Sequence, residues 1–192
     1  MDAEQVASYL STEELAEQLL SRLPGWDRVP RDHKANTPRR FVTMLDYLTT
    51  RSEFNFTTFP NDGMDEMIVL SPIPFYALCA HHVIPFFGNA HIGYVPDGKI
   101  AGLSKFARAV KSMSRGLWVQ EELTKEIADF LNSTLSPRGV AVVLKAEHLC
   151  MAMRGVQLPG VITTTSSMKG VFGDHSRTAK AEFLQWIRTH SE

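Results

Sequence analysis

The chain has 192 residues, 20 Lys and Arg against 21 Asp and Glu, and 44% hydrophobic residues, among them 11 Phe. This length suits one compact domain with an appendage, and the apolar content excludes a chain that is disordered throughout. A net charge of -1 offers no overall attraction to nucleic acid or to an anionic membrane. No apolar run approaches the roughly 20 residues of a membrane span.

The N-terminal part of the chain carries two helical patterns. The first helix is capped near Ser11, has leucines at helical spacing, and ends before Pro24. The second begins at Thr37, with proline in its first turn, and runs to about Arg51. A loop rich in Thr, Asn, Asp and Gly follows. We therefore predict an N-terminal helical region over residues 1–62.

From there on, β-forming and helical patterns come in pairs, and this second region spans residues 63–192. Strand pairs that bracket a helix pair predict an α+β fold, an antiparallel sheet with two helices on one face. Parallel winding would instead alternate single strands with single helices. The predicted elements are strands at 67–77 and 87–95, helices at 103–113 and 119–131, strands at 140–150 and 161–168, and a final helix at 177–189.

The start of the chain, M-D-A-E-Q, is acidic, whereas a secretory signal has basic residues before an apolar core. The two cysteines do not make a disulfide scaffold, which is typical of a reducing compartment. We expect a cytoplasmic protein.

Those two cysteines carry the main functional signal. Cys79 and His82 have C-x-x-H spacing, and alternation along the later strand places His148 and Cys150 on one face. If the two segments meet, Cys79, His82 and Cys150 form a set of sulfur and nitrogen donors that suits Zn²⁺. Three protein ligands would leave a position for water, whose pKa zinc lowers to about 7. His81 and His148 are then candidates for general acid and base.

Two other interpretations of these residues stay open. Free cysteines in a cytosolic protein are often small buried apolar residues. A closed structural site would instead recruit His81 or His148 as a fourth ligand. Spacing alone does not choose among the three.

A polar stripe follows one face of the helix at 103–113. The stripe is a solvated helix face or a clamp for a polyphosphate, since Lys, Arg and hydroxyl groups near a helix start suit phosphate oxygens. Arg154 and Arg40 could contribute to such a clamp. Its members recur at steps of three and four residues and are Ser104, Lys105, Arg108, Lys111, Ser112 and Arg115.

Gln120 and Glu121 open the next predicted helix. A carboxylate there is favourable against the helix dipole whatever the function. The same carboxylate could also accept two hydrogen bonds from the N1-H and 2-amino edge of a guanine.

Taken together, these segments resemble the GTP cyclohydrolase I family over roughly residues 36–187. A set of ordered blocks is more specific than any single motif. The blocks are N-T-P-R-R at 36–40, C-A-H-H at 79–82, H-I-G-Y-V-P at 91–96, G-L-S-K-F-A-R at 102–108, V-Q-E-E-L-T at 119–124, G-V-A-V-V at 139–143, E-H-L-C-M-A-M-R-G-V at 147–156 and T-T-T-S-S at 163–167.

The resemblance implies a tunnelling fold, in which β-β-α-α-β-β units assemble into a multi-subunit β-barrel, and a homodecamer with active sites at subunit interfaces. It implies hydrolysis of GTP at C8 with release of formate and rearrangement to 7,8-dihydroneopterin triphosphate, the first step toward pterins, folate or deazaguanine nucleosides. By position, Cys79, His82 and Cys150 would bind Zn²⁺, and His81 and His148 would be the acid and base. The substrate-binding residues would be Ser104, Lys105, Arg108, Gln120, Glu121, Arg154 and, from a neighbouring subunit, Arg40.

The chain also departs from the family pattern. Ala80 stands where Glu is usual, Gly116 and Trp118 replace a basic and a polar residue, and Glu122 replaces Arg. These departures leave two alternatives to a GTP cyclohydrolase I. One is a divergent tunnelling-fold enzyme acting on a related purine or pterin. The other is a non-catalytic, zinc-stabilised nucleotide-binding assembly.

Overall fold

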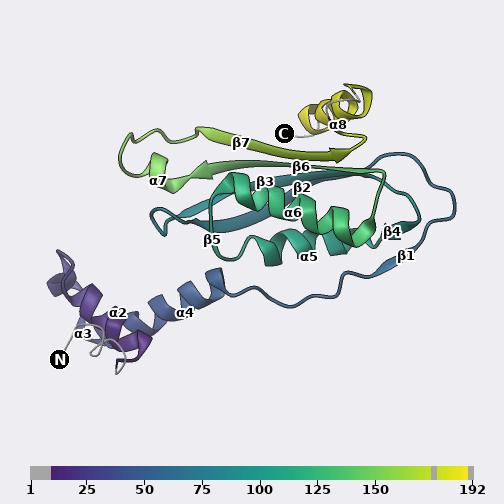
Figure 1. Cartoon of the computed structure of the whole chain (residues 1–192). Helices are drawn as coiled ribbons and strands as arrows, with labels where there is room; N and C mark the ends of the chain where they lie inside the picture. Colours follow the sequence, from purple (N-terminus) through teal and green to yellow (C-terminus); the bar gives the residue numbers. More distant parts are fainter. Residues whose placement is uncertain (1–9, 174–176, 190–192) are drawn as a thin grey trace, which may run out of the picture. The chain divides into compact units, whose positions relative to one another are not determined.

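The computed structural model describes residues 10–173 and 177–189 (Figure 1). These residues divide into two compact units, one ending at Thr50 and the other beginning at Arg51. The boundary lies earlier in the chain than the predicted boundary at residue 62. None of the helices in the described part is long and apolar enough to cross a membrane.

The first unit is helical. A capping box starts its first helix: the Ser11 backbone N-H donates to Glu14 Oε2 at 2.7 Å, and Glu14 N-H donates to Ser11 Oγ at 3.3 Å. Proline in the first turn of the last helix is compatible with its geometry, because the missing N-H has no helical partner there. The elements are α2 (Thr12–Ser21), the short helix η1 (Trp26–Arg28), α3 (Arg31–Lys34) and α4 (Thr37–Thr49).

The second unit is built on a five-stranded sheet with strand order β5-β2-β3-β6-β7. Its long strands pair antiparallel, while the short β5 runs parallel to β2. A separate two-stranded ribbon joins β1 (Thr58–Pro60) to β4 (Lys99–Ala101). The strands of the main sheet are β2 (Ile68–Cys79), β3 (Pro85–Val95), β5 (Leu117–Trp118), β6 (Gly139–His148) and β7 (Ile162–Gly170).

Two helices, α5 (Leu103–Met113) and α6 (Gln120–Leu135), cover one face of this sheet (Figure 1). Their apolar stripes meet the inward-facing side chains of the three central strands, as the period-two and period-3.6 patterns require. Phe106 and Leu131 are fully buried in that core, opposite Ile92 and Leu144 of the sheet. The predicted α+β arrangement with two helices on one face is confirmed.

The opposite face is partly covered by α8 (Arg177–Thr189). Phe183 and Ile187 of this helix form a second core with Phe172 and with Val143 of β6. The close approach requires glycine at position 93, because a Cβ there would lie 2.7 Å from Phe183 Cδ2.

The segment that precedes β1 packs on the helical layer. Phe54 makes an edge-to-face contact with Phe130, at a ring-centroid distance of 5.8 Å. Phe56 makes similar contacts with Phe106 at 5.6 Å and Phe130 at 5.4 Å. These three contacts explain why the segment belongs to the second unit, although its composition is that of a loop.

One prediction about the later strands is wrong. The strand predicted to continue to residue 150 ends at His148, and Cys150 lies in the single-turn helix α7 (Leu149–Ala152). Strand alternation therefore does not place Cys150 beside His148. The helical turn brings the thiol back toward the same core, where Cys150 packs half-buried.

A candidate metal and nucleotide site

Three side chains of types that can bind a metal meet at one end of the sheet. Cys79 is the last residue of β2, His148 is the last of β6, and Cys150 follows in α7. Strand β3 lies between β2 and β6, and its residue Phe86 is paired with His148. One ligand atom from each of Cys79, His148 and Cys150 lies within 4.8 Å of the other two. The two segments that carry the cysteines therefore meet at this edge, and the third member of the group is His148.

The predicted histidines His81 and His82 follow Cys79 in an exposed turn. Their Nδ1 atoms lie 3.6 Å and 3.8 Å from Cys79 Sγ, respectively. The Cys79 thiol therefore has three imidazoles near it, those of His81, His82 and His148. Both His81 and His82 are exposed to solvent.

The thiols influence each other electrostatically. Burial raises the pKa of the Cys150 thiol, and the neighbouring Cys79 raises it further, while Arg154 opposes the shift. Two thiols this close resist becoming thiolates together unless a cation compensates the charge. A divalent metal would remove that obstacle, because thiolate is the form that binds it.

His148 is held between an aromatic ring and a polar network. Its ring stacks on Phe86 with 4.6 Å between centroids and 2° between planes. Burial lowers the pKa of His148, and the carboxylate of Glu121 opposes this shift. The neutral imidazole is therefore favoured at neutral pH.

Gln120 connects this histidine to the rest of the sheet. Its side chain is 2% exposed, and its Oε1 lies 2.7 Å from His148 Nε2. Its amide nitrogen lies 3.2, 3.1 and 3.0 Å from Leu144 O, Thr163 O and Thr165 Oγ1, three acceptors that share its two hydrogens. The predicted guanine-binding side chain is thus fully engaged within the protein.

Two further predicted residues lie near this cluster. Glu121 is exposed in the first turn of α6, close enough for its charge to act on His148. Arg154 is exposed just after α7, close enough for its charge to act on Cys150. A carboxylate and a guanidinium therefore flank the thiol and imidazole groups, which is an arrangement suited to a polar, anionic ligand.

The predicted phosphate clamp lies elsewhere in the same subunit. Ser104, Lys105 and Arg108 are in the first half of α5, which starts near the Val95 end of the sheet. The helix then runs toward β5 and the Cys79 end, and about 14 Å of helix axis separates Ser104 from Met113. These three residues therefore lie away from the Met113 end of the helix. Arg40 is an exposed residue of α4 in the first unit.

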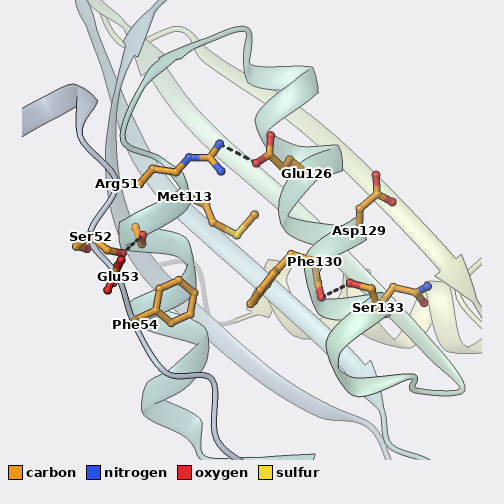
Figure 2. A pocket seen from close by; sticks show the side chains of 11 residues that line it. Arg51, Ser52, Glu53, Phe54, Met113, Glu126, Asp129, Phe130 and Ser133 are labelled. Carbon is orange, nitrogen blue, oxygen red and sulfur yellow. Dashed lines mark hydrogen bonds and ion pairs between the residues drawn. The ribbon is translucent and has the colours of Figure 1, made fainter.

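A cavity of about 920 Å³ opens between the segment at 51–54 and the two covering helices (Figure 2). Figure 2 shows the Arg51 guanidinium paired with Glu126 across its mouth, at 2.7 Å. Met113 and Phe130 supply its apolar wall, and Asp129 and Ser133 stand on its rim. Of the candidate residues named from the sequence, Ser112 of the polar stripe lines this cavity, whereas Cys79, His148 and Cys150 do not.

Two of the departures from the family pattern form a matched pair. Gly116 has φ +135°, and a Cβ there would lie 3.0 Å from Trp118 Nε1. The Trp118 indole donates to Arg115 O at 3.3 Å and lies under the Arg51 guanidinium, 5.1 Å from the ring centroid. Glycine thus accommodates the indole. Ala80 and Glu122 are exposed, and nothing in the structure explains them.

The sequence analysis missed the residues that orient His148. In the sequence, Phe86 has the pattern of an ordinary core residue. Its stacking partner His148 follows only from the register between β3 and β6. Thr124 and Thr165 lie 2.6 Å apart through their hydroxyls. The T-T-T-S-S run at 163–167 marked the segment, but no pattern indicates which threonine faces the site.

This fold and this donor set define an α+β protein with a site suited to a thiophilic metal, flanked by groups for a polar ligand. The profile of the GTP cyclohydrolase I family matches residues 12–188. The chain belongs to the GTP cyclohydrolase I family, as the resemblance indicated.

Similarity to curated proteins supports the same family membership. The chain is 47% identical over 163 residues to a GTP cyclohydrolase 1 of Sulfurihydrogenibium sp. (strain YO3AOP1), covering 84% of this chain and 87% of that protein. It is 46% identical over 159 residues to that of Aquifex aeolicus (strain VF5), covering 82% and 86%. It is 44% identical over 181 residues to that of Methylococcus capsulatus (strain ATCC 33009 / NCIMB 11132 / Bath), covering 91% and 96%.

Among solved structures, the apo form of the archaeosine synthase QueF-Like aligns with a TM-score of 0.43 and 18% identity, over 57% of this chain and 97% of that one. Similarity at this level does not establish a common fold.

Proposed function

We propose that this chain is a GTP cyclohydrolase I, which hydrolyses GTP at C8, releases formate and forms 7,8-dihydroneopterin triphosphate. The family membership and the relatives named GTP cyclohydrolase 1 support this activity. The observation that carries it in the structure is the gathering of Cys79, His148 and Cys150 within 4.8 Å of one another. Glu121 and Arg154 beside them offer partners for a base and for phosphate oxygens.

The cofactor of this site is Zn²⁺, held by Cys79, Cys150 and His82. Two sulfurs and an imidazole are the donor types that zinc prefers. The Cys79 thiol lies close enough to disfavour ionisation of Cys150, and a divalent cation would compensate that effect. When bound, zinc supplies a Lewis acid that makes water acidic near neutral pH.

The protons are moved by His81 and His148, which are near the thiol pair without both being needed as ligands. An imidazole titrates close to working pH, so it can take a proton in one step and return it in another. His148 is held in place by Phe86 and Gln120, whereas His81 lies in an exposed turn. Because these contacts hold the His148 ring, this side chain needs little reorganisation when the substrate binds.

Glu121 holds the guanine. Its carboxylate is exposed at the start of α6 and near His148, where it can accept from two donors of the base. Arg154 binds the triphosphate or ribose close to Cys150.

The rest of the clamp comes from another subunit. Ser104, Lys105 and Arg108 lie in the first half of α5, away from the end of the helix that leads to β5, and they complete the site of a neighbour, together with Arg40. The active enzyme is then a homo-oligomer, a decamer with a β-barrel and active sites at subunit interfaces.

Two features of the surface support this assembly. Strand β7 forms an edge of the sheet, and an edge strand offers unpaired backbone groups to a further strand. The segment between Cys150 and β7 exposes apolar side chains next to the site, at Met153, Val156, Leu158 and Val161. Exposed apolar residues gathered in this way are typical of an interface.

The reaction itself is tested with purified, zinc-loaded protein and GTP, following formate and the dihydroneopterin chromophore together. Both signals are expected. Formate without the pterin would mean that ring opening works and the rearrangement does not. Neither signal, with zinc bound and the oligomer intact, would overturn the proposal and favour another purine or pterin as substrate.

The guanine contact is tested with a matched pair of neighbours on α6. Glu121→Gln should raise KM for GTP about tenfold or more, because the amide turns an NH₂ donor, in place of a carboxylate oxygen, toward one of the two donors of the base. Glu122→Gln changes the same charge one position further along and should leave KM near that of the parent protein. Equal effects of the two substitutions would contradict the assignment.

The shared site is tested by complementation. Lys105→Ala and Cys150→Ala should each abolish turnover alone, since one lacks the clamp and the other the thiol. Co-assembled in one oligomer, they should regain part of the activity, because some interfaces then receive both intact residues. Absence of any recovery, with mixed oligomers demonstrated by mass spectrometry, would place the whole site within one subunit.

The non-catalytic alternative is tested at His81. If the metal site is closed and structural with His81 as a ligand, His81→Ala should release zinc and destabilise the protein. For an acid or base, the same substitution should abolish turnover and leave the zinc content unchanged.

A further inference from the structure

The hydrogen-bond network around Gln120 determines where His148 carries its proton. Gln120 starts α6, its side chain is 2% exposed, and it contacts strands β6 and β7 as well as the histidine. Each hydrogen in this network can be counted, because several partners are backbone carbonyls that only accept.

The count begins at Thr124. Its hydroxyl donates to the backbone carbonyl of Gln120 at 2.7 Å, which uses its one hydrogen. The 2.6 Å contact between the hydroxyls of Thr124 and Thr165 therefore needs Thr165 as the donor. Thr165 Oγ1 then has no hydrogen left and must accept from the side chain of Gln120.

The two carbonyls lead to the same orientation of the amide. Leu144 O and Thr163 O face the same end of the Gln120 side chain at 3.2 and 3.1 Å. Turning the amide over would place its oxygen against both carbonyls and against Thr165 Oγ1. Such a buried cluster of acceptors without donors costs the desolvation of each group. The NH₂ group must point to the sheet.

The amide oxygen is thereby directed at His148. Gln120 Oε1 lies 2.7 Å from His148 Nε2 and can only accept, so Nε2 must carry a hydrogen. A neutral imidazole has one N-H, and Nδ1 is consequently the atom with a free lone pair. Stacking on Phe86 holds the ring plane.

We infer that Gln120 is a positioning residue that holds His148 in the Nε2-H tautomer and so presents an unprotonated Nδ1 to the site. This inference deepens the proposed function, since it gives His148 the role of proton acceptor at the start of the reaction. The role differs from the guanine contact expected of Gln120, because both amide hydrogens are used within the protein and the side chain is only 2% exposed.

The tautomer is tested directly by ¹⁵N spectroscopy of the zinc-loaded protein with labelled histidine, the His148 signals being assigned by their loss in His148→Gln. The expected result is an Nε2 with an attached hydrogen and an Nδ1 without one. A hydrogen on Nδ1 would overturn the inference. This readout needs no turnover, so it stands or fails independently of the GTP reaction.

The consequence for catalysis is tested with Gln120→Met, which keeps the length of the side chain and removes the amide. The His148 signals should then show both tautomers, and kcat should fall about 10- to 100-fold with KM for GTP and zinc content unchanged. Leu131→Met, in the fully buried part of the same helix, is the control for loosened packing and should alter neither tautomer nor kcat. A raised KM with unchanged kcat in Gln120→Met would instead assign the amide to substrate binding.

Discussion

Phe86 links the stability of the fold to the geometry of the site. It is fully buried, stacks on His148 at 4.6 Å and meets Phe75 edge-to-face at 6.0 Å. The substitution Phe86→Ala removes the whole ring. It leaves a cavity beneath the imidazole that the backbone of β3 cannot fill.

The expected cost follows from these contacts. Replacing a buried Phe by Ala typically costs about 3–5 kcal/mol, the lost ring contacts with Phe75 and His148 included. For a chain of this size that corresponds to a fall in Tm on the order of 10 °C. A parent stability in the upper part of the usual range of about 5–15 kcal/mol leaves the variant folded at 25 °C, where its turnover can be measured.

The prediction separates stability from catalysis by comparison with Phe172→Ala. Phe172 is also fully buried, but in the second core, where its ring meets Phe183 at 5.9 Å. Both substitutions should lower Tm in differential scanning calorimetry by similar amounts. Only Phe86→Ala should also lower kcat at 25 °C, because only that substitution lets the His148 ring tilt.

Two results would refute this reasoning. If Phe86→Ala kept full kcat despite the lower Tm, the stacked ring would not be needed to orient His148. If Phe172→Ala lost as much kcat as Phe86→Ala, the effect would come from general loosening of the sheet.

Three further predictions concern stability. Burial, with a contribution from Lys145, lowers the pKa of His91 from 6.5 to about 4. As the pH falls, the unfolded state therefore binds this proton before the folded state does. The unfolding free energy should consequently fall by up to about 3 kcal/mol between pH 6.5 and 4. Urea titrations should show a flatter pH profile for His91→Gln, and an unchanged profile would contradict this. Gly116→Ala should cost about 1–3 kcal/mol in the same assay, since φ is +135° and the Cβ meets Trp118, whereas Gly98→Ala, with open space around it, should be nearly neutral. Arg51→Ala removes an exposed ion pair to Glu126 and a cation–π contact with Trp118 and should cost about 1 kcal/mol, and a loss above about 3 kcal/mol would indicate a further role.

Much of the fold was predictable because its signals are local. The long strands and helices of the second unit have the apolar periods of a half-covered sheet and of amphipathic helices. The short elements β1, β4 and β5 escaped prediction, since two or three residues show no period and their pairing depends on distant strands. The end of β6 was predicted wrongly for a related reason. The alternation of residue types continues in the sequence past His148, whereas the backbone turns into α7 there.

The identity of the metal-ligating side chains was already contained in the spacing of Cys79, His82, His148 and Cys150 and in their resemblance to a family. Their meeting was not, because it depends on β2 and β6 ending at the same edge on either side of β3. The place of Ser104 and Lys105 relative to the sheet likewise depends on how α5 packs on it.

The role of Gln120 is the clearest case of the same limit. Its position before Glu121 suggested a contact with guanine. A position at the start of a helix does not determine which groups the side-chain amide faces. Its partners His148 and Thr165 are 28 and 45 residues away, on two different strands. Local patterns report the period and burial of one segment at a time, whereas a hydrogen bond between segments exists only when strand register and helix packing bring the two atoms within 3 Å or so of each other.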